Sequence, residues 1–493
     1  MPSFLPKSML VPLIVACALF MESLDGTIIT TALPDMAVSF HDRPVRLSLG
    51  ITAYMLSLAV FIPVSGWVAD RFGAKRVFSA AMAVFTLGSL LCGLSHNVFE
   101  LAGARILQGV GGAMMVPVGR LVLLRTIDKS ELVRAMGYMT VPALIGPVLG
   151  PPVGGFITTY ASWRWIFFLN LPMGVLGIYL VLRYIPNYRE SETWKLDWLG
   201  FLTSGLSLTC LMSGFEMIGR DTVAPGLVYG CLGLGLAVGV LAILHARRHP
   251  HPLIDLSLLK FPTFSVTVSG GSLFRIGVGA MPFLLPMMLQ VGFGMTAFDS
   301  GLITFSGAVG SLAMKMSARP IIQYYGFRTS MVANGLISAA SVLVCCVFTR
   351  QTPLMIVFML ILIGGFFRSL QFTALNTLAF AEVPPRQMSA ATSLSSMMQQ
   401  ISLGLGVAVA ALILHVSATL RGTAGGQVTV ADFHVAFLLI GLLSIVAIWP
   451  FLGLKPDAGE DVSGHHAKKP GLKKRDLKVS ARPAAEVRRA PAE

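Results

Sequence analysis

The chain has 493 residues, of which 55% are hydrophobic and 12% are charged, whereas a soluble globular chain carries roughly 25% charged residues. This composition excludes an ordinary cytosolic enzyme, and the length accommodates many membrane-spanning helices of about 20 apolar residues each. The formal net charge of +14 could indicate nucleic-acid binding, but basic residues in an apolar chain more often mark cytoplasmic loops. The positions of the charges decide between the two.

Fourteen apolar segments follow one another along the chain, each long enough to cross a bilayer as a helix. They lie near residues 10–34, 47–69, 77–95, 97–118, 136–157, 163–185, 198–218, 225–244, 262–290, 296–314, 329–349, 353–381, 388–415 and 432–453. With a cytoplasmic N-terminus, 28 Lys and Arg fall on the cytoplasmic side and 6 on the other; without the C-terminal tail the numbers are 18 and 6. This asymmetry predicts an all-α membrane protein with both termini in the cytoplasm and no nucleic-acid partner.

Two carboxylates lie within the first expected helix, in the sequence Glu22-Ser23-Leu24-Asp25. Asp25 is about 8 residues, or roughly 12 Å, from the outer helix end, and Glu22 lies on nearly the same helix face. A charge at this depth is expensive unless it faces a cavity or a partner. Both residues are therefore candidates for a titratable site.

The loop after the second expected helix reads GWVADRFGAKR, from Gly66 to Arg76. Gly66 permits close helix approach, Gly73 permits a sharp turn, and Asp70 can accept hydrogen bonds from cationic neighbours or a helix N-terminus. Such contacts can latch one conformation. The segment resembles the signature loop of the major facilitator superfamily, although Ala74 replaces the first arginine of that pattern. The resemblance implies that six residues gate the conformational change: Gly66, Asp70, Arg71, Gly73, Lys75 and Arg76.

The fourth expected helix carries Arg105 at the start of RILQGVGGA, which is similar to the R-x-x-Q-G motif of the same superfamily. Arg105 is about 8 residues from the outer end of its helix, and so shares its depth with Asp25. We expect the two to pair, for proton coupling or, as the open alternative, for structure alone. The sequence around Asp25 resembles the corresponding segment of the fourteen-helix branch of the superfamily.

Glycine and proline follow a fixed spacing in the fifth expected helix. The spacing resembles the antiporter motif G-x8-G-x3-G-P-x2-G-G, and the matching residues are Gly137, Gly146, Gly150, Pro151, Gly154 and Gly155. Glycines four residues apart stack on one helix face and let a neighbouring helix approach closely. Such packing suits a joint between two moving halves.

The next expected helix opens with WRWIFFLNLPMG, residues 163–174, which is similar to a segment of the fourteen-helix drug:proton antiporters (EmrB/QacA type). The specific motifs lie in the first 200 residues, where the match is close to bacterial multidrug exporters. The family architecture implies six helices, two inserted helices and six more. The expected units are residues 1–185, 186–261 and 262–453, followed by a basic, disordered cytoplasmic tail, 454–493, that contacts anionic lipids.

The second half lacks some features of the first. Its loop at residues 323–328 keeps Gly326 but has no aspartate. Arg275 and Arg368 lie near mid-membrane, with no acidic residue in the core of their own helices. We expect a substrate cavity here, although at this spacing the aromatic residues could be plain packing. Its expected residues are Arg275, Phe283, Phe367, Arg368, Gln371 and Asn376.

These features predict a proton-coupled efflux transporter, a drug:H⁺ antiporter that exports amphipathic small molecules by alternating access. Asp25 would carry the exchanged proton, Glu22 would assist it, and Arg105 would tune both pKa values. Two unpaired arginines keep open a second reading, export of an anionic metabolite or a metal-carboxylate chelate.

No catalytic residue, metal or cofactor is expected, because neither an H-E-x-x-H cluster nor a P-loop occurs. The chain is therefore not expected to be an enzyme. The expected partners are a small-molecule substrate, protons and the lipid bilayer, with the chain functional as a monomer. The expected location is the bacterial cytoplasmic (inner) membrane, which the chain crosses many times.

Overall fold

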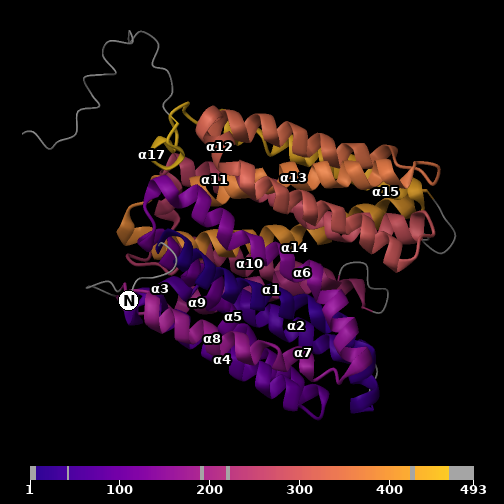
Figure 1. Cartoon of the computed structure of the whole chain (residues 1–493), viewed down its shortest axis with the longest axis horizontal. Helices are drawn as coiled ribbons and strands as arrows, with labels where there is room; N and C mark the ends of the chain where they lie inside the picture. The colour runs from indigo at the N-terminus through magenta and orange to yellow at the C-terminus, as the bar shows by residue number, and fades with distance from the viewer. Residues whose placement is uncertain (1–6, 42–43, 189–193, 218–222, 422–427, 466–493) are drawn as a thin grey trace, which may run out of the picture.

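The computed structural model describes residues 7–41, 44–188, 194–217, 223–421 and 428–465, and every regular element in these ranges is a helix (Figure 1). The first half contains α1 Lys7–Phe40, α2 Pro44–Phe61, α3 Ser65–Phe72, α4 Ala74–Leu94, α5 Val98–Thr126, α6 Leu132–Tyr160, α7 Trp165–Phe168 and α8 Asn170–Tyr184. Then come α9 Trp198–Met217 and α10 Pro225–Arg248. The second half contains α11 Pro262–Met287, α12 Ala297–Leu343, α13 Leu354–Leu378, α14 Met388–Leu420, α15 Val430–Val446, α16 Trp449–Leu452 and α17 Glu460–Ser463.

Capping side chains set several helix starts. Asn97 accepts a hydrogen bond from the backbone N–H of Glu100 at the start of α5, at 2.9 Å. Thr429 and Asp432 form a capping box that opens α15. Each satisfies backbone N–H groups that the first helical turn leaves unpaired.

Eleven of the helices in the described residues are long and apolar enough to cross a membrane, or twelve if α2 and α3, bent by 60°, form one span. The chain is therefore a multi-pass membrane protein. Two boundaries differ from the expected ones. The segment 47–69 bends between Phe61 and Ser65, next to Pro63, which has no N–H to donate.

The segments 296–314 and 329–349 were expected as separate helices, and they run together as α12, 47 residues long. The chain changes direction within α12 at Gly326, which has φ 72° and ψ 170°. These are angles that only glycine adopts readily, so hydrogen bonding continues across what is a turn.

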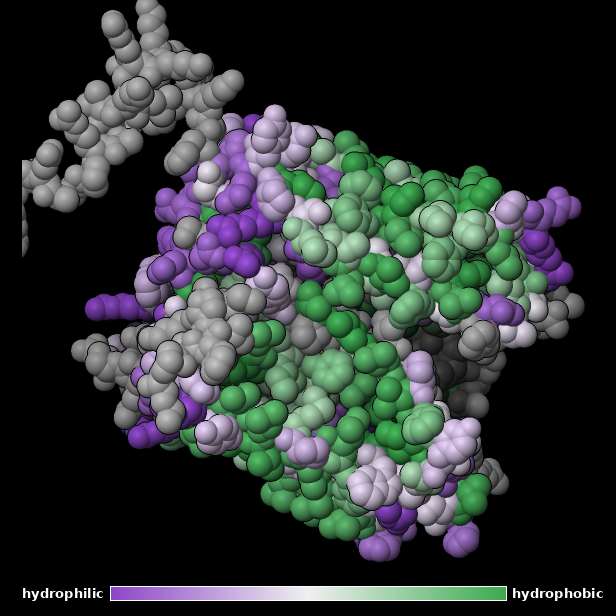
Figure 2. Space-filling model, in the orientation of Figure 1, coloured by the Kyte–Doolittle hydropathy of each residue, from purple (hydrophilic) through white to green (hydrophobic). Residues whose placement is uncertain are grey.

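The helices form two bundles with the inserted pair beside them. In Figure 1, α11, α12, α13 and α15 lie in the upper part and α2, α4, α5 and α8 in the lower part. The inserted helices α9 and α10 pack on each other, and α9 also contacts α2 and α14. Apolar side chains cover the flank of the molecule and polar ones gather at its two ends (Figure 2), which is the pattern that a bilayer requires.

The two halves meet at the end of the molecule that carries α3 and α17, here called the latch end (left in Figure 1). There α14 contacts α3 and α5, and α12 contacts α6. The prediction of a disordered tail from residue 454 is wrong for residues 454–465. Val462 is 1% exposed, and Gly459 packs against the ring of Phe327. Residues 466–493 lie outside the described ranges.

Candidate functional site

A hydrogen-bonded ion pair lies inside the first half. Asp25 on α1 and Arg105 on α5 are each 1% exposed, and Arg105 Nη1 donates to Asp25 Oδ2 at 2.5 Å. The two residues predicted to share a depth therefore also face each other. A buried pair of this kind costs desolvation energy, which is offset only if further hydrogen bonds satisfy both ions.

Two neutral residues bond the carboxylate, and a third joins the two. Gln108 Nε2 and Asn170 Nδ2 both donate to Asp25 Oδ1 at 2.9 Å, and Arg105 Nη1 also donates to Gln108 Oε1 at 2.8 Å. Ser89 Oγ accepts from Gln108 and Asn170, at 2.7 and 3.1 Å. The Asp25 carboxylate thus holds together α1, α5 and α8, with α4 attached through Ser89.

The arginine is further held by aromatic rings. Its guanidinium lies 5.0 Å from the ring centroid of Phe167 and 5.5 Å from that of Tyr54, distances at which a cation is attracted to a ring face. Nε and Nη2 of Arg105 have no hydrogen-bond partner among the described residues. Glu22 lies one turn along α1 from Asp25. Its buried Oε2 also has no hydrogen-bond partner in the ranges that the structure describes.

The latch joins the two halves through Asp70 and Gly66. Asp70 accepts a hydrogen bond from Ser389 Oγ at the start of α14, and its Oδ1 lies 3.5 Å from Arg125 Nη2. A Cβ at Gly66 would lie 2.7 Å from both Ser389 O and Ser393 Oγ. Only glycine therefore permits the observed approach of α3 to α14.

The other loop residues contribute differently. Gly73, predicted to permit a turn, has φ 93° between α3 and α4. Arg71 and Arg76 are exposed and Lys75 is partly buried. Next to Gly66, the Oγ of Ser65 lies 2.9 Å from Ser393 Oγ, so α3 reaches α14 through Ser65 as well as through Asp70.

A second connection at the latch end involves the loop that lacks an aspartate. Arg319 of α12 donates to both carboxylate oxygens of Glu131, at 2.8 and 3.3 Å, and so ties the second half to the first. Gly326 makes the turn, and the backbone carbonyl of Gln323 beside it lies 2.9 Å from His465 Nδ1. An arginine and a glutamate elsewhere thus make the contact that the loop itself cannot.

The glycines of the antiporter-like spacing bring α6 onto α1. A Cβ at Gly146 would lie 2.8 Å from Ser23 Cβ, and one at Gly150 would collide with Thr27. These contacts flank Asp25 on α1, so the close packing is within the first half and not at a joint between halves. Gly137 and Gly155 have open space around them, Gly154 is buried, and the side chain of Pro151 lies outside the described part of the chain.

The residues expected to line one substrate cavity have different neighbours. Arg275 is 2% exposed, and its Nη2 donates to Asn376 Oδ1 at 3.3 Å. The Arg368 guanidinium lies beside Gly364 and Gly307, between α13 and α12. Gln371 Oε1 accepts from Asn334 at 2.9 Å. Phe367 packs on the large core cluster, and Phe283 on a smaller one.

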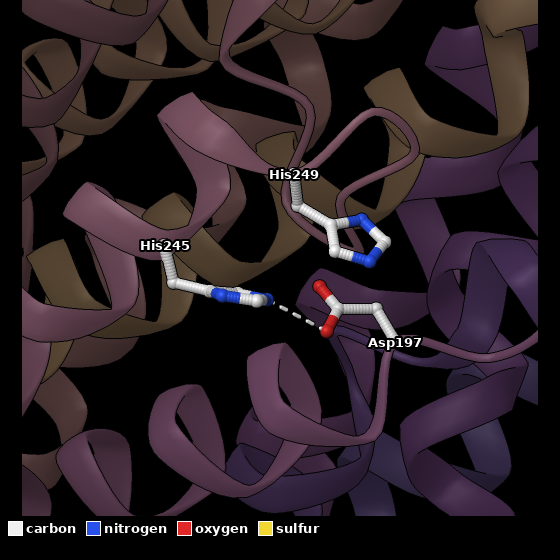
Figure 3. Close-up of side chains that lie close together, drawn as sticks. All are labelled: Asp197, His245 and His249. Carbon is white, nitrogen blue, oxygen red and sulfur yellow. Dashed lines mark hydrogen bonds and ion pairs between the residues drawn. The ribbon is translucent and has the colours of Figure 1, made fainter.

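A third cluster fastens the inserted helices. Asp197 precedes α9, and its Oδ1 accepts from the backbone N–H of Gly200 and lies 2.8 Å from His245 Nε2; its Oδ2 accepts from the N–H of Leu253 (Figure 3). Burial raises the pKa of Asp197, but these hydrogen bonds outweigh it and hold that pKa below its usual value. With His249, the three side chains offer metal-ligand atoms within 4.8 Å of one another. Because both Asp197 oxygens already accept hydrogen bonds, the cluster as it stands is a clamp.

A cavity of about 540 Å³ lies between this clamp and the latch. Its lining includes Asp70, Ser389 and Ser393 of the latch and Asp197 of the clamp. Trp67 on its wall donates from Nε1 to the carbonyl of Trp194 at 2.9 Å. The cavity therefore connects both halves and the inserted pair.

Two helical bundles around buried charges, with a latch at one end, define a membrane transporter. The chain belongs to the Major Facilitator Superfamily, whose family model matches residues 15–259 and 267–489. Transporters of this superfamily are not enzymes, and neither is this chain.

Named relatives match nearly the whole chain. It is 36% identical over 451 residues to the "Putative multidrug resistance protein MdtD" of Shigella boydii serotype 4, covering 91% of this chain and 95% of the relative. The protein of that name from Escherichia coli K12 matches with the same identity and coverage.

Two solved structures share the fold. A double Trp mutant of XylE has a TM-score of 0.64 at 15% identity, covering 92% of this chain and 98% of that chain. The human organic anion transporter MFSD10 has a TM-score of 0.62 at 14% identity, covering 89% and 100%.

The sequence predicted the pairing of Asp25 with Arg105 and a latch at Asp70 and Gly66, but it did not predict the other residues that these side chains contact. Gln108 and Asn170 lie inside the two motifs that drew attention to Arg105 and to the start of the sixth helix, so the signal was present. Ser389 and Arg125 carry no such signal, because they reach Asp70 only through the folding of distant segments.

Proposed function

We propose that the chain is a proton-coupled exporter of amphipathic small molecules, a drug:H⁺ antiporter that works by alternating access. The observation that carries the proposal is the buried Asp25 carboxylate, bound to Arg105, Gln108 and Asn170. The relatives' name, a multidrug resistance protein, supports the substrate class.

Protonation of Asp25 would couple to movement of α1. The ionised carboxylate attracts Arg105 and accepts two amide N–H bonds, whereas the neutral acid loses the ion pair and part of its acceptor capacity. Glu22, one turn away, is a second group able to hold a proton. Since Gly146 and Gly150 pack α6 directly on α1, a shift of α1 would move α6 with it.

The latch would gate access to the site. Asp70 and Gly66 close one end against Ser389, and opening that end requires these contacts to break. Gly73 supplies the turn, while Arg71, Lys75 and Arg76 lie where they can contact lipid headgroups or the latch in its other state. The substrate would bind among the second-half residues Arg275, Phe283, Phe367, Arg368, Gln371 and Asn376.

The proposed topology is fourteen spans in the order six, two and six. Twelve spans are counted above, with α12 as one span and α6 not included. Dividing α12 at Gly326 into two spans gives a thirteenth, and α6, which is 29 residues long, gives a fourteenth. Both termini then lie on the cytoplasmic side of a bacterial inner membrane, which is also the side of the latch end. A monomer contains the whole site, and the basic tail contacts anionic lipids.

The test is transport by Asp25→Asn in proteoliposomes with an imposed pH gradient. We expect gradient-driven efflux of a cationic dye to be abolished, because no proton leaves the site, while the protein level is unchanged. The matched control is Asp35→Asn, an exposed carboxylate on the same helix. Normal pumping by Asp25→Asn would refute the proposal.

A second candidate is export of an anionic metabolite or metal-carboxylate chelate. Buried cations favour it, because no ion pair is recorded for Arg275 or Arg368 in the described residues. Selective loss of carboxylate export in Arg275→Ala and Arg368→Ala would support this candidate, and loss of dye efflux alone would oppose it.

A further inference from the structure

Arg120 is a buried cation that the sequence places in a loop. The apolar segment was expected to end at residue 118, but α5 continues to Thr126 and Arg120 is 2% exposed. Its Nη1 lies 3.5 Å from Ser395 Oγ of α14, in the other half. An arginine that crosses between halves at this depth needs a partner that offsets its desolvation.

Arg120 and Arg275 flank one face of α13 and the turn after it. The Arg275 guanidinium lies 5.7 Å from the ring centroid of Phe372 and bonds Asn376. The Arg120 guanidinium lies 5.9 Å from the ring centroid of Phe380. Because Phe372, Asn376 and Phe380 follow at intervals of four residues, they lie along one side of the helix and its extension.

The two arginines belong to different halves and carry the same charge. Both guanidiniums lie against the side of α13 and its following turn that carries Phe372, Asn376 and Phe380. Nε of each has no hydrogen-bond partner among the described residues, and neither has a recorded ion pair there. Like charges in a medium of low dielectric repel strongly, so the closed state holds two guanidiniums whose charge no side chain in the described ranges neutralises.

We propose that Arg120 and Arg275 form a subsite for an acidic group of the transported molecule, a carboxylate carried on an aromatic or similarly apolar body. This rests on the proposed function and specifies its substrate class. A carboxylate accepts two parallel N–H bonds from a guanidinium, and the rings of Phe372 and Phe380 supply an apolar surface on either side of Asn376. Ser395 and Asn376 provide further polar contacts.

The subsite couples substrate binding to closure of the latch end. Without an anion, repulsion between Arg120 on α5 and Arg275 on α11 opposes the approach of the halves. A bound carboxylate removes that repulsion, so it binds best when the halves are together and shifts the population toward that state. The substrate thus promotes the step that carries it away from the latch end.

The test uses phthalate, an aromatic dicarboxylate, with its uncharged dimethyl ester as comparison. Thermal unfolding of the purified full chain measures binding, and counterflow in proteoliposomes measures transport. We expect phthalate to raise the melting temperature and to be transported, and the ester to do neither. Arg120→Gln and Arg275→Gln should each weaken phthalate binding at least about tenfold, because each removes a charge-assisted hydrogen bond.

The control is Lys315→Gln, which removes another cation of the second half, one that donates to Thr373 Oγ1 at 2.7 Å. It should bind phthalate as the unaltered chain does. If Arg275→Gln does not fold, Arg275→Lys keeps the charge but loses the planar fork, and intermediate binding is expected.

Three results would overturn the proposal. They are unchanged melting with phthalate, equal binding by the arginine variants and Lys315→Gln, and binding without transport, which would mark a regulatory anion. Dye efflux that depends on Asp25 is measured in the same vesicles. Its loss or persistence reports on proton coupling, so failure of the subsite and failure of the proposed function are distinguishable.

Discussion

The buried ion pair of the first half and the buried arginines of the second half have different surroundings. In the first half, Asp25 and Arg105 neutralise each other, and Gln108 and Asn170 complete the carboxylate's hydrogen bonds. In the second half, Arg275 donates to the neutral Asn376, and Nη1 of Arg368 has no hydrogen-bond partner among the described residues. Protonating Asp25 breaks an interaction inside the protein, whereas an arginine without an acidic partner attracts an anion from outside. In the proposed function, the ion pair couples the proton and the arginines help to bind the substrate.

The sharpest way to break this comparison is to remove one arginine from each half. Arg105→Ala leaves the Asp25 carboxylate buried and unpaired, which should cost about 3–5 kcal/mol of stability. Arg275→Ala leaves no carboxylate behind and should cost below about 1 kcal/mol, because an unpaired buried cation is itself unfavourable. Unfolding in mixed detergent micelles measures both.

The double variant Asp25→Asn with Arg105→Gln is the control for this prediction. It removes both charges and should recover much of the loss. Equal costs for Arg105→Ala and Arg275→Ala would remove the distinction between the halves.

A smaller effect is expected at the latch. Gly66→Ala places a methyl group 2.7 Å from the backbone of Ser389, and overpacking of this kind costs about 1–3 kcal/mol. The halves relieve it by separating, so the latch-open state gains population roughly tenfold. Alkylation of Ser393→Cys in a cysteine-free background should accelerate accordingly.

Gly103→Ala is the matched control for the latch, since a Cβ at Gly103 meets no atom within 4 Å. Its alkylation rate should stay at the level of the parent. A rate in Gly66→Ala no higher than in Gly103→Ala would contradict the role of Gly66.

The two charged connections at the latch end should differ in the same assay. Asp70→Asn weakens the contacts of Asp70 to Ser389 and Arg125. In the Asp70–Arg125 ion pair, the side chain of Asp70 is 22% exposed and that of Arg125 is 12% exposed. Glu131→Gln breaks the pair with Arg319, which is about one-third exposed on both sides. Exposed pairs contribute about 0–1 kcal/mol, so Asp70→Asn should open the latch severalfold more than Glu131→Gln. If Glu131→Gln opened the latch more than Asp70→Asn, the Arg319–Glu131 pair would be the stronger of the two connections.

The smallest effect concerns the clamp of the inserted helices. The pKa of Asp197 lies below its usual value, so its contribution to stability is present above the unfolded-state pKa and disappears as the pH falls through the folded-state pKa. When the pH is lowered from about 5 to about 3, the melting temperature of the parent chain should fall further than that of Asp197→Asn. Parallel pH profiles for the two would show that the clamp adds no stability.

The sequence predicted how far along its helix each buried charge lies, but not toward which neighbouring helix its side chain points. Asp25 and Arg105 were matched because equal distance from the helix end can be counted from residue numbers. Arg275 and Arg368 share a depth by the same count, yet one faces Asn376 and the other lies between α13 and α12. The rotation of a helix about its own axis depends on its neighbours, and apolar periodicity is weak in helices that face lipid on one side and protein on the other.

Hydropathy also misplaced the helix ends. Arg120 and Lys315 were assigned to loops because a window average falls where charged residues begin. The structure continues α5 and α12 past them, since a buried cation with a suitable neighbour does not end a helix. A charged residue at the edge of an apolar segment is therefore easily assigned to a loop when it lies inside the protein on a helix.

The segment after residue 454 has a consequence for everything that follows it. His465 lies beside Gln323 of the second half, and Asp461 Oδ2 lies 3.7 Å from Lys129 Nζ of the first. The chain therefore leaves the described ranges at the seam between the halves, and nine Lys and Arg follow His465 in the sequence. Salt screens exposed charges, so raising its concentration should weaken any attraction between these residues and the seam.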